Sequence, residues 1–180
     1  MKIIEAMNAL KTTEKKLSQK QALLSKYSAR PSFREDAFKK DGKDGEAELI
    51  SQTIQACEDL IAQHESLKRA IDYTNLMTQV DVVIGGVTKK FTIHSLIKHK
   101  KELIRMKRAV WSSLNDRDAQ LEVSQLRMKP DTKINAQVVY NFDIREREGR
   151  LEELHDLEAQ VDSALQIANS RIDLLSVPGP

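Results

Sequence analysis

The residues of this sequence best suited to chemistry are its single cysteine and its four histidines. Cys57 and His64 lie seven positions apart on one edge of a predicted helix, which separates them by about 10 Å along its axis. A nucleophile must contact its base directly, so this spacing excludes a catalytic pair within one helix. We interpret the two residues as a small core cysteine and a half-buried histidine.

A second pair, Glu152 and His155, has the three-residue spacing of ligands in di-iron helical bundles. Such a site requires a second pair of the same kind, and none occurs around His64, His94 or His99. We therefore predict a solvated helix face without a metal. The sequence also lacks a phosphate-binding loop, an HExxH motif and a GxSxG motif. Neither an enzymatic activity nor a cofactor is predicted.

The densest group of like charges is a run of six basic residues in which Glu102 is the only acid. The six are Lys98, Lys100, Lys101, Arg105, Lys107 and Arg108. Residues 143–173, in contrast, carry nine acids against four arginines. A basic helix and an acidic helix in one chain predict charge complementarity within the fold or between subunits. Binding of nucleic-acid phosphates and a merely solvated face are the alternatives.

Polar residues also occur beside the apolar stripes of two predicted long helices. A polar residue in a helix seam commonly determines register or oligomer state at some cost in stability. A small-ligand pocket built on these side chains is the alternative. The residues assigned to register or oligomer contacts are Thr74, Asn75 and Asn169, with Ile54, Ile61 and Leu165 from the stripes.

Proline and glycine are few, which predicts long helices separated by a small number of breaks. The first helix is expected over residues 2–27, because apolar residues recur at alternating spacings of four and three. Its stripe consists of Ile3, Met7, Leu10, Leu17 and Leu24, with Glu14 and Gln21 as polar interruptions. Residues 28–45, which contain Pro31 and alternating charges, are expected to form a flexible connector.

The second helix is expected over residues 46–77 and would be about 45 Å long. A single compact globule cannot cover that length, so a partner helix must lie along most of it. The predicted apolar edge consists of Ile50, Ile54, Cys57, Ile61, His64 and Ile71, widened by Leu60 and Leu67.

Two β-hairpins are predicted between the helices. Residues 80–91 contain β-branched and aromatic residues on either side of Gly85 and Gly86, which is typical of a two-residue turn. Residues 121–140 repeat the pattern around a longer loop at Lys129–Thr132. Thr92 is expected to cap a third helix that reaches about residue 115.

Asp143, with Glu146 three residues later, is expected to start the last helix. The apolar stripe of this helix would continue through Leu175 until Pro178 stops it, with a bend or late start at Gly149.

Composition agrees with a single, mainly helical domain covering residues 1–180. Aromatic residues make up only 4% of the sequence, and the net charge of +2 does not indicate a nucleic-acid or membrane partner. No stretch approaches the roughly 18 apolar residues of a membrane span, and Met1–Glu5 does not resemble the start of a signal peptide. One cysteine cannot form an internal disulfide. A cytoplasmic protein is therefore expected.

The order of these segments resembles the septicolysin-like family of small bacterial proteins. The resemblance is carried by Lys2–Met7, Ile71–Thr78, Gly86–Thr92 followed by Leu96, Ile97 and Leu103, Phe142–Ile144, and Leu165–Asn169. It spans nearly the whole chain. What the resemblance implies is a fold of long helices that oligomerises, and the family name suggests a lytic activity.

These observations predict a mainly α-helical, oligomeric protein of long antiparallel helices with two small β-hairpins. The expected function is that of a non-enzymatic scaffold that binds copies of itself, and other assembly proteins in a larger assembly such as a phage particle. Its location would then be the cytoplasm or a virion. The alternatives are a membrane-acting lytic protein, which the mean hydropathy of −0.49 disfavours, and a nucleic-acid-binding accessory protein that uses residues 98–108.

Overall fold

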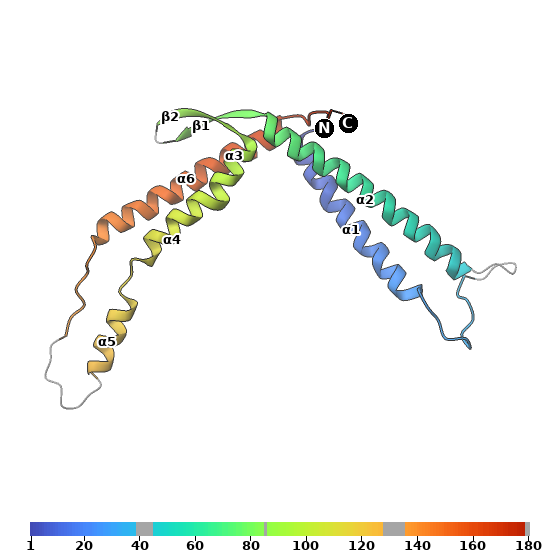
Figure 1. Cartoon of the computed structure of the whole chain (residues 1–180), viewed down its shortest axis with the longest axis horizontal. Helices are drawn as coiled ribbons and strands as arrows, with labels where there is room; N and C mark the ends of the chain where they lie inside the picture. Colours follow the sequence, from blue (N-terminus) through green and yellow to red (C-terminus); the bar gives the residue numbers. More distant parts are fainter. Residues whose placement is uncertain (39–44, 85, 128–135, 179–180) are drawn as a thin grey trace. The chain divides into compact units, whose positions relative to one another are not determined.

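The computed structural model describes residues 1–38, 45–84, 86–127 and 136–178 (Figure 1). It confirms a mainly helical protein with a small antiparallel two-stranded sheet. The protein forms two compact units where a single domain was expected. Unit 1 comprises Met1–Thr78 with Ile167–Pro180, and unit 2 comprises Gln79–Gln166. Within the described residues, no helix is long and apolar enough to cross a membrane.

Unit 1 is built on a hairpin of two long helices, α1 (Ile3–Tyr27) and α2 (Gly45–Met77), which run antiparallel side by side (Figure 1). Both helices agree closely with the predicted ranges. Buried and half-buried residues alternate at spacings of three and four, which is the pattern of a coiled-coil seam. The seam consists of Ile3, Ala6, Leu10, Thr13, Leu17, Lys20, Leu24 and Tyr27 on α1, and Ile50, Thr53, Cys57, Leu60, His64, Leu67, Ile71 and Thr74 on α2.

The seam differs from the predicted stripes on both helices. On α1, Ala6 and Thr13 face inward, whereas Met7 is 40% exposed. On α2, Ile54 and Ile61 lie beside the seam and are 46% and 50% exposed. The seam threonines satisfy their own hydroxyls by donating to the carbonyl four residues earlier; Thr13 donates to Ala9 at 2.9 Å. Small residues of this kind fit a close helix pair although their hydrophobic signal in the sequence is weak.

Part of the predicted flexible connector is anchored to the start of α2. The carboxylate of Asp36 accepts hydrogen bonds from the backbone N–H of Phe38 and of Glu46, in the manner of a helix cap. The side chain of Glu46 is itself buried and forms ion pairs with Arg30 and Arg34. Residues 28–38 are therefore held by specific contacts, and the expected flexibility of residues 39–44 lies outside the described residues.

The two ends of the protein meet in unit 1. Helix α6 (Ile144–Arg171) ends seven residues before Pro178, so the prediction that it continues through Leu175 is wrong. Beyond α6 the backbone turns to other partners: Leu174 N–H donates to the carbonyl of Met1, and Lys2 pairs with Asp173 in an isolated β-bridge. These long-range hydrogen bonds replace the helical ones. Gly149 lies within α6, which begins at Ile144, so no late start occurs there.

Unit 2 begins with the predicted first hairpin. Strands β1 (Gln79–Ile84) and β2 (Val87–Thr92) pair antiparallel, with Val82 opposite Lys89. Gly86 has a φ of +79°, which a residue with a side chain rarely adopts and a two-residue hairpin turn requires. The hairpin is confirmed on either side of Gly85, which lies outside the described residues.

The predicted third helix is one continuous helical stretch with an unusual centre. It consists of α3 (Ile93–Lys98), a π-helix η1 (His99–Ile104) and α4 (Arg105–Ser113). As predicted, Thr92 caps α3 by accepting a hydrogen bond from the Ser95 N–H at 3.1 Å. The stretch packs with β1 against α6, where the buried core consists of Val82, Leu96, Ile104, Leu154 and Val161.

The second predicted hairpin, residues 121–140, is wrong. Helix α5 (Arg117–Arg127) occupies its first arm, and no strand occurs in its second arm, residues 136–140. The loop at Lys129–Thr132 lies outside the described residues. Ala119, Val123 and Leu126 are half-buried on one helical face, so the spacing that resembled a strand in fact serves a helix. Asn115 supports its start by accepting a hydrogen bond from Arg117 N–H.

Candidate interaction surfaces

The two residues with nucleophilic and basic character are engaged in packing. Cys57 is buried and 9% exposed, and the side chain of His64 is 31% exposed in the same seam. His64 Nε2 lies 3.2 Å from Glu14 Oε1 of α1, so its partner is a carboxylate on the opposite helix. This confirms the interpretation as a core cysteine and a half-buried histidine.

The two residues of α6 that have the spacing of di-iron ligands lie on a solvated face, as expected. Glu152 and His155 are both exposed. Across the ranges that the structure describes, no three side chains of His, Cys, Asp or Glu are grouped closely enough to hold a metal ion.

The basic residues of α3, η1 and α4 face the acidic helix α6 at two points. Lys100 Nζ donates to Asp162 Oδ1, and an Arg108 guanidinium nitrogen donates to Glu158 Oε2, each at 2.5 Å. This confirms charge complementarity within the fold for these two residues. Lys98 lies 4.0 Å from Glu102 on its own helical stretch. The other members of the basic run, Lys101, Arg105 and Lys107, are exposed.

The π-helix determines which basic residues reach α6. Leu96, Lys100, Ile104 and Arg108 follow one another at intervals of four, and in a regular α-helix such residues drift around the axis by about 40° per step. The wider turns of η1 absorb this drift and keep the four on the α6 side. His99 begins η1, and its pKa is lowered by burial and, to a smaller extent, by the charge of Lys107. The six-residue basic patch is thus divided between α6 and solvent.

Thr74 holds the last described segment of the protein against α2. Its side chain is fully buried, its hydroxyl donates to Ala70 O at 2.7 Å, and the same oxygen accepts from Leu175 N–H at 2.9 Å. The residue therefore has a structural role within unit 1, at the position where an oligomer or register contact was predicted.

We expect Thr74→Val to lower the free energy of unfolding by about 1 to 3 kcal/mol, because Leu175 N–H loses its acceptor. Thr53→Val is the matched control: Thr53 is also buried in the seam, but its hydroxyl only donates to Leu49 O. The control should change stability by less than about 1 kcal/mol. Urea denaturation followed by circular dichroism measures both. Equal effects of the two substitutions would contradict the assigned role of Thr74.

Asn75 carries a side-chain oxygen that none of the described residues satisfies. Its Oδ1 is buried without a hydrogen-bond partner among the described residues. Asn169 is half-buried on the part of α6 that belongs to unit 1. Leu165 is half-buried and packs against the core of unit 2, so it contributes to folding there. An unsatisfied buried amide is consistent with a role in register, which stays a prediction.

We expect Asn75→Leu to leave stability unchanged or raise it by about 1 kcal/mol, because the substitution removes the unsatisfied oxygen. If Asn75 specifies register, the oligomer should become less uniform. Asn75→Asp should destabilise by roughly 1 to 3 kcal/mol, because it buries a charge. Gln63→Leu, at an exposed position of α2, controls for the added apolar surface. Thermal melts measure the stability of the variants, and light scattering measures the uniformity of their oligomers. A large loss of stability in Asn75→Leu would show that the amide satisfies specific groups.

Exposed apolar residues on α2 form a ridge along one flank of the hairpin. Ile54 and Ile61 are about half exposed, and Glu58 and Glu65 alternate with them at helical spacing. We call Ile54, Glu58, Ile61 and Glu65 the acidic ridge. The sequence indicated its two isoleucines as apolar contacts, and the structure shows that the intramolecular seam leaves them to solvent.

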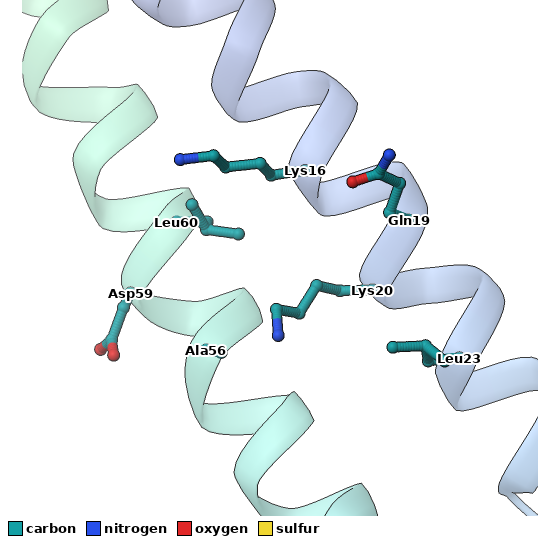
Figure 2. Close-up of a pocket in the computed structure, with 7 residues that line it drawn as sticks. All are labelled: Lys16, Gln19, Lys20, Leu23, Ala56, Asp59 and Leu60. Atoms are coloured by element: carbon teal, nitrogen blue, oxygen red, sulfur yellow. The ribbon is translucent and has the colours of Figure 1, made fainter.

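The opposite flank contains a groove of about 400 Å³ between α1 and α2. Lys16 and Lys20 extend from α1 toward α2, Leu23 and Leu60 point into the space between the helices, and Asp59 points away (Figure 2). We call Lys16, Lys20, Leu23, Ala56 and Leu60 the basic groove; Gln19 and Asp59 complete its lining. Sequence reasoning missed this groove, because its lysines lie outside the charge clusters and Leu23 and Ala56 lie outside the predicted stripes.

The fold and these surfaces are those of a mainly helical protein with two units, each built on paired helices. Unit 2 also contains a small β-hairpin. A similar structure is the crystal structure of a functionally unknown conserved protein from Corynebacterium diphtheriae. It is 20% identical with a TM-score of 0.61, and the match covers 97% of this protein and 99% of that one. No protein-family model and no curated protein matches the sequence. The similarity shows the fold, and the resemblance to the septicolysin-like family stays a prediction.

Proposed function

We propose that this protein is a non-enzymatic structural protein that assembles with copies of itself through the exposed faces of its helices. The observation that carries the proposal is the number of large apolar side chains that helix pairing leaves in contact with water. On α2 these are Ile54 and Ile61, and along η1 and α4 they are Leu103, Met106 and Val110, which are 45%, 58% and 65% exposed. The three lie at helical spacing and form a continuous stripe, which favours a protein partner.

The cores of the two units are also small. Among the described residues, the buried core cluster of unit 2 contains five residues, and the buried seam positions of unit 1 include Thr13, Thr53 and Thr74. Threonine contributes less hydrophobic stabilisation than leucine or isoleucine. Assembly would therefore add directly to the stability of the protein.

Gel filtration coupled to light scattering tests the proposal on the 180-residue protein. We expect a mass that is a multiple of 20.5 kDa at micromolar concentration, and a melting temperature that rises with protein concentration. A 20.5 kDa species with a cooperative, concentration-independent melt would contradict it. A 20.5 kDa species that melts poorly would instead indicate a different protein as the partner.

Two other functions remain to be separated from assembly by experiment. A lytic protein should release dye from liposomes at micromolar concentration, whereas a scaffold should not. A nucleic-acid-binding protein should retain duplex DNA or RNA with a strong dependence on salt, and lose it on reversal of the charges at Lys101, Arg105 and Lys107. We favour assembly because α6 already neutralises Lys100 and Arg108 of the basic run. Assembly in the cytoplasm, or within a virion, belongs to the same proposal.

A further inference from the structure

The acidic ridge and the basic groove of unit 1 are complementary in form and in charge. The ridge presents two half-exposed isoleucines separated by seven residues, about 10 Å apart, with Glu58 and Glu65 beside them. The groove offers an apolar lining of Leu23, Ala56 and Leu60. Apolar side chains of a docking helix would enter the groove, and its carboxylates would meet the lysines at the rim.

The charges on both surfaces are available for such contacts. Among the described residues, none lies within ion-pair distance of Lys16, Lys20 or Glu58. Within the described part of the protein, Glu65 pairs only with Arg69 of its own helix, and both side chains are more than 60% exposed. Exposed pairs of this kind contribute little to stability, so Glu65 can exchange its partner at small cost. The flexible stems of Lys16 and Lys20 can also lie along apolar surface while their ammonium groups reach a carboxylate.

The two surfaces lie on opposite flanks of the hairpin. In the heptad pattern of α2, Ile54 and Ile61 follow the seam positions Thr53 and Leu60 on one side of the helix. Ala56 precedes the seam position Cys57 and lies on the other side, where the groove residues of α1 meet it. The ridge therefore cannot reach the groove of its own hairpin, so a ridge that fills this groove must come from another molecule.

We propose that the acidic ridge of one copy docks into the basic groove of a second copy, so that the copies associate head to tail through unit 1. This inference rests on the proposed function and names the partner and the contact surfaces. A head-to-tail contact uses different surfaces on the two partners, so each bound copy still offers a free ridge or a free groove. Such an assembly closes into a ring or grows as a filament. It stops at a dimer only if the ridge and the groove of each copy are both occupied by the other copy.

Two charge-reversed variants test the contact. The groove variant carries Lys16→Glu and Lys20→Glu, so its groove repels the acidic ridge of another copy of the same variant. The ridge variant carries Glu58→Lys and Glu65→Lys, so its ridge repels the basic groove of another copy of the same variant. We expect each variant alone to assemble at least tenfold more weakly than the wild type, as judged by light scattering across a concentration series.

Mixing the two variants in equal amounts should restore contacts between them. The acidic ridge of the groove variant meets the unchanged basic groove of the ridge variant, as in the wild type. The lysines of the reversed ridge likewise meet the glutamates of the reversed groove, so both kinds of junction join opposite charges. We therefore expect the mixture to assemble when neither variant alone does.

A control variant carries Lys11→Glu and Lys15→Glu, which make the same change in charge on exposed residues of α1 outside the groove. It should assemble like the wild type and should not rescue the ridge variant. Circular dichroism checks that all the variants keep their helix content, so loss of assembly is not loss of folding. Recovery of assembly only in the mixture of groove and ridge variants would support the proposal.

The outcomes also separate this inference from the proposed function. A wild-type oligomer that both charge reversals leave unchanged, or that the mixture fails to restore, would overturn ridge-to-groove docking while leaving self-assembly through another face. A wild-type protein that stays at 20.5 kDa over the whole concentration range would overturn both.

Discussion

Deletion of Lys101 is expected to leave unit 2 folded, whereas deletion of one residue from α6 should unfold most of it. Lys101 is an exposed residue of the π-helix, and Leu96 of α3 is followed at intervals of four by Lys100 and Ile104 of the π-helix. Without it, Ile104 would follow Lys100 after three residues, and the spacing would suit a regular α-helix. The flanking helices would keep their faces toward α6, so we expect a change of less than about 1 kcal/mol in the free energy of unfolding.

Deletion of Gln160 is the contrasting variant. It is also exposed, but α6 has no wide turn to absorb the loss, so everything beyond it would rotate by about 100° relative to Leu154. Val161 would leave the core and Asp162 would leave Lys100, at a cost of roughly 3 to 5 kcal/mol. Trp111, the single tryptophan, packs against this core, so its fluorescence in urea reports on unit 2. Equal damage by both deletions would contradict the role given to the π-helix.

Leu96→Ala is expected to cost about 2 to 5 kcal/mol, which is a large part of the stability of a small unit. Leu96 is 0% exposed and packs with Val82, Ile104 and the buried residues of α6. Truncation would leave a cavity among side chains that belong to a hairpin and two helices, and these elements cannot all close around it.

Leu103→Ala is the matched control, because Leu103 lies on the same helical stretch and is 45% exposed. We expect it to change the free energy of unfolding of the isolated protein by less than about 0.5 kcal/mol. The fluorescence of Trp111 during urea denaturation measures both variants. A cost below about 1 kcal/mol for Leu96→Ala would show that the core of unit 2 is not packed as described.

The features that sequence reasoning predicted correctly are those set by local rules. The apolar repeats indicated both long helices, Gly85 and Gly86 indicated the first hairpin, and Thr92 was expected to cap α3. Asp143 was expected to start α6, and it accepts hydrogen bonds from the N–H groups of Arg145 and Glu146. Each depends on residues within one turn or one hairpin, where the chemistry of the side chains decides the backbone conformation.

The misplaced features depended either on a choice between two local periodicities or on partners that are distant in the sequence. Leu121 and Val123 alternate with polar residues as in a strand, yet α5 forms because Val123 and Leu126 also share a helical face. The end of α6 is determined by the residues that follow it. Leu174 N–H donates to the carbonyl of Met1 and Leu175 N–H donates to the Thr74 hydroxyl, and both acceptors lie more than 100 positions away. Nothing near Leu175 in the sequence indicates those partners.

The sequence by itself determined where the long helices lie, how the first hairpin turns and which segments carry opposite charge. Only the tertiary structure decided which edge of each long helix is covered. Neighbouring stripes of one amphipathic helix differ by a rotation of only about 40°. Ala6 and Thr13 allow α1 to approach α2 closely, so the seam passes through them and leaves Ile54 and Ile61 in water. Shape and small size select the seam, whereas hydrophobicity selects the candidate stripes, and this is why the acidic ridge became visible only in the folded protein.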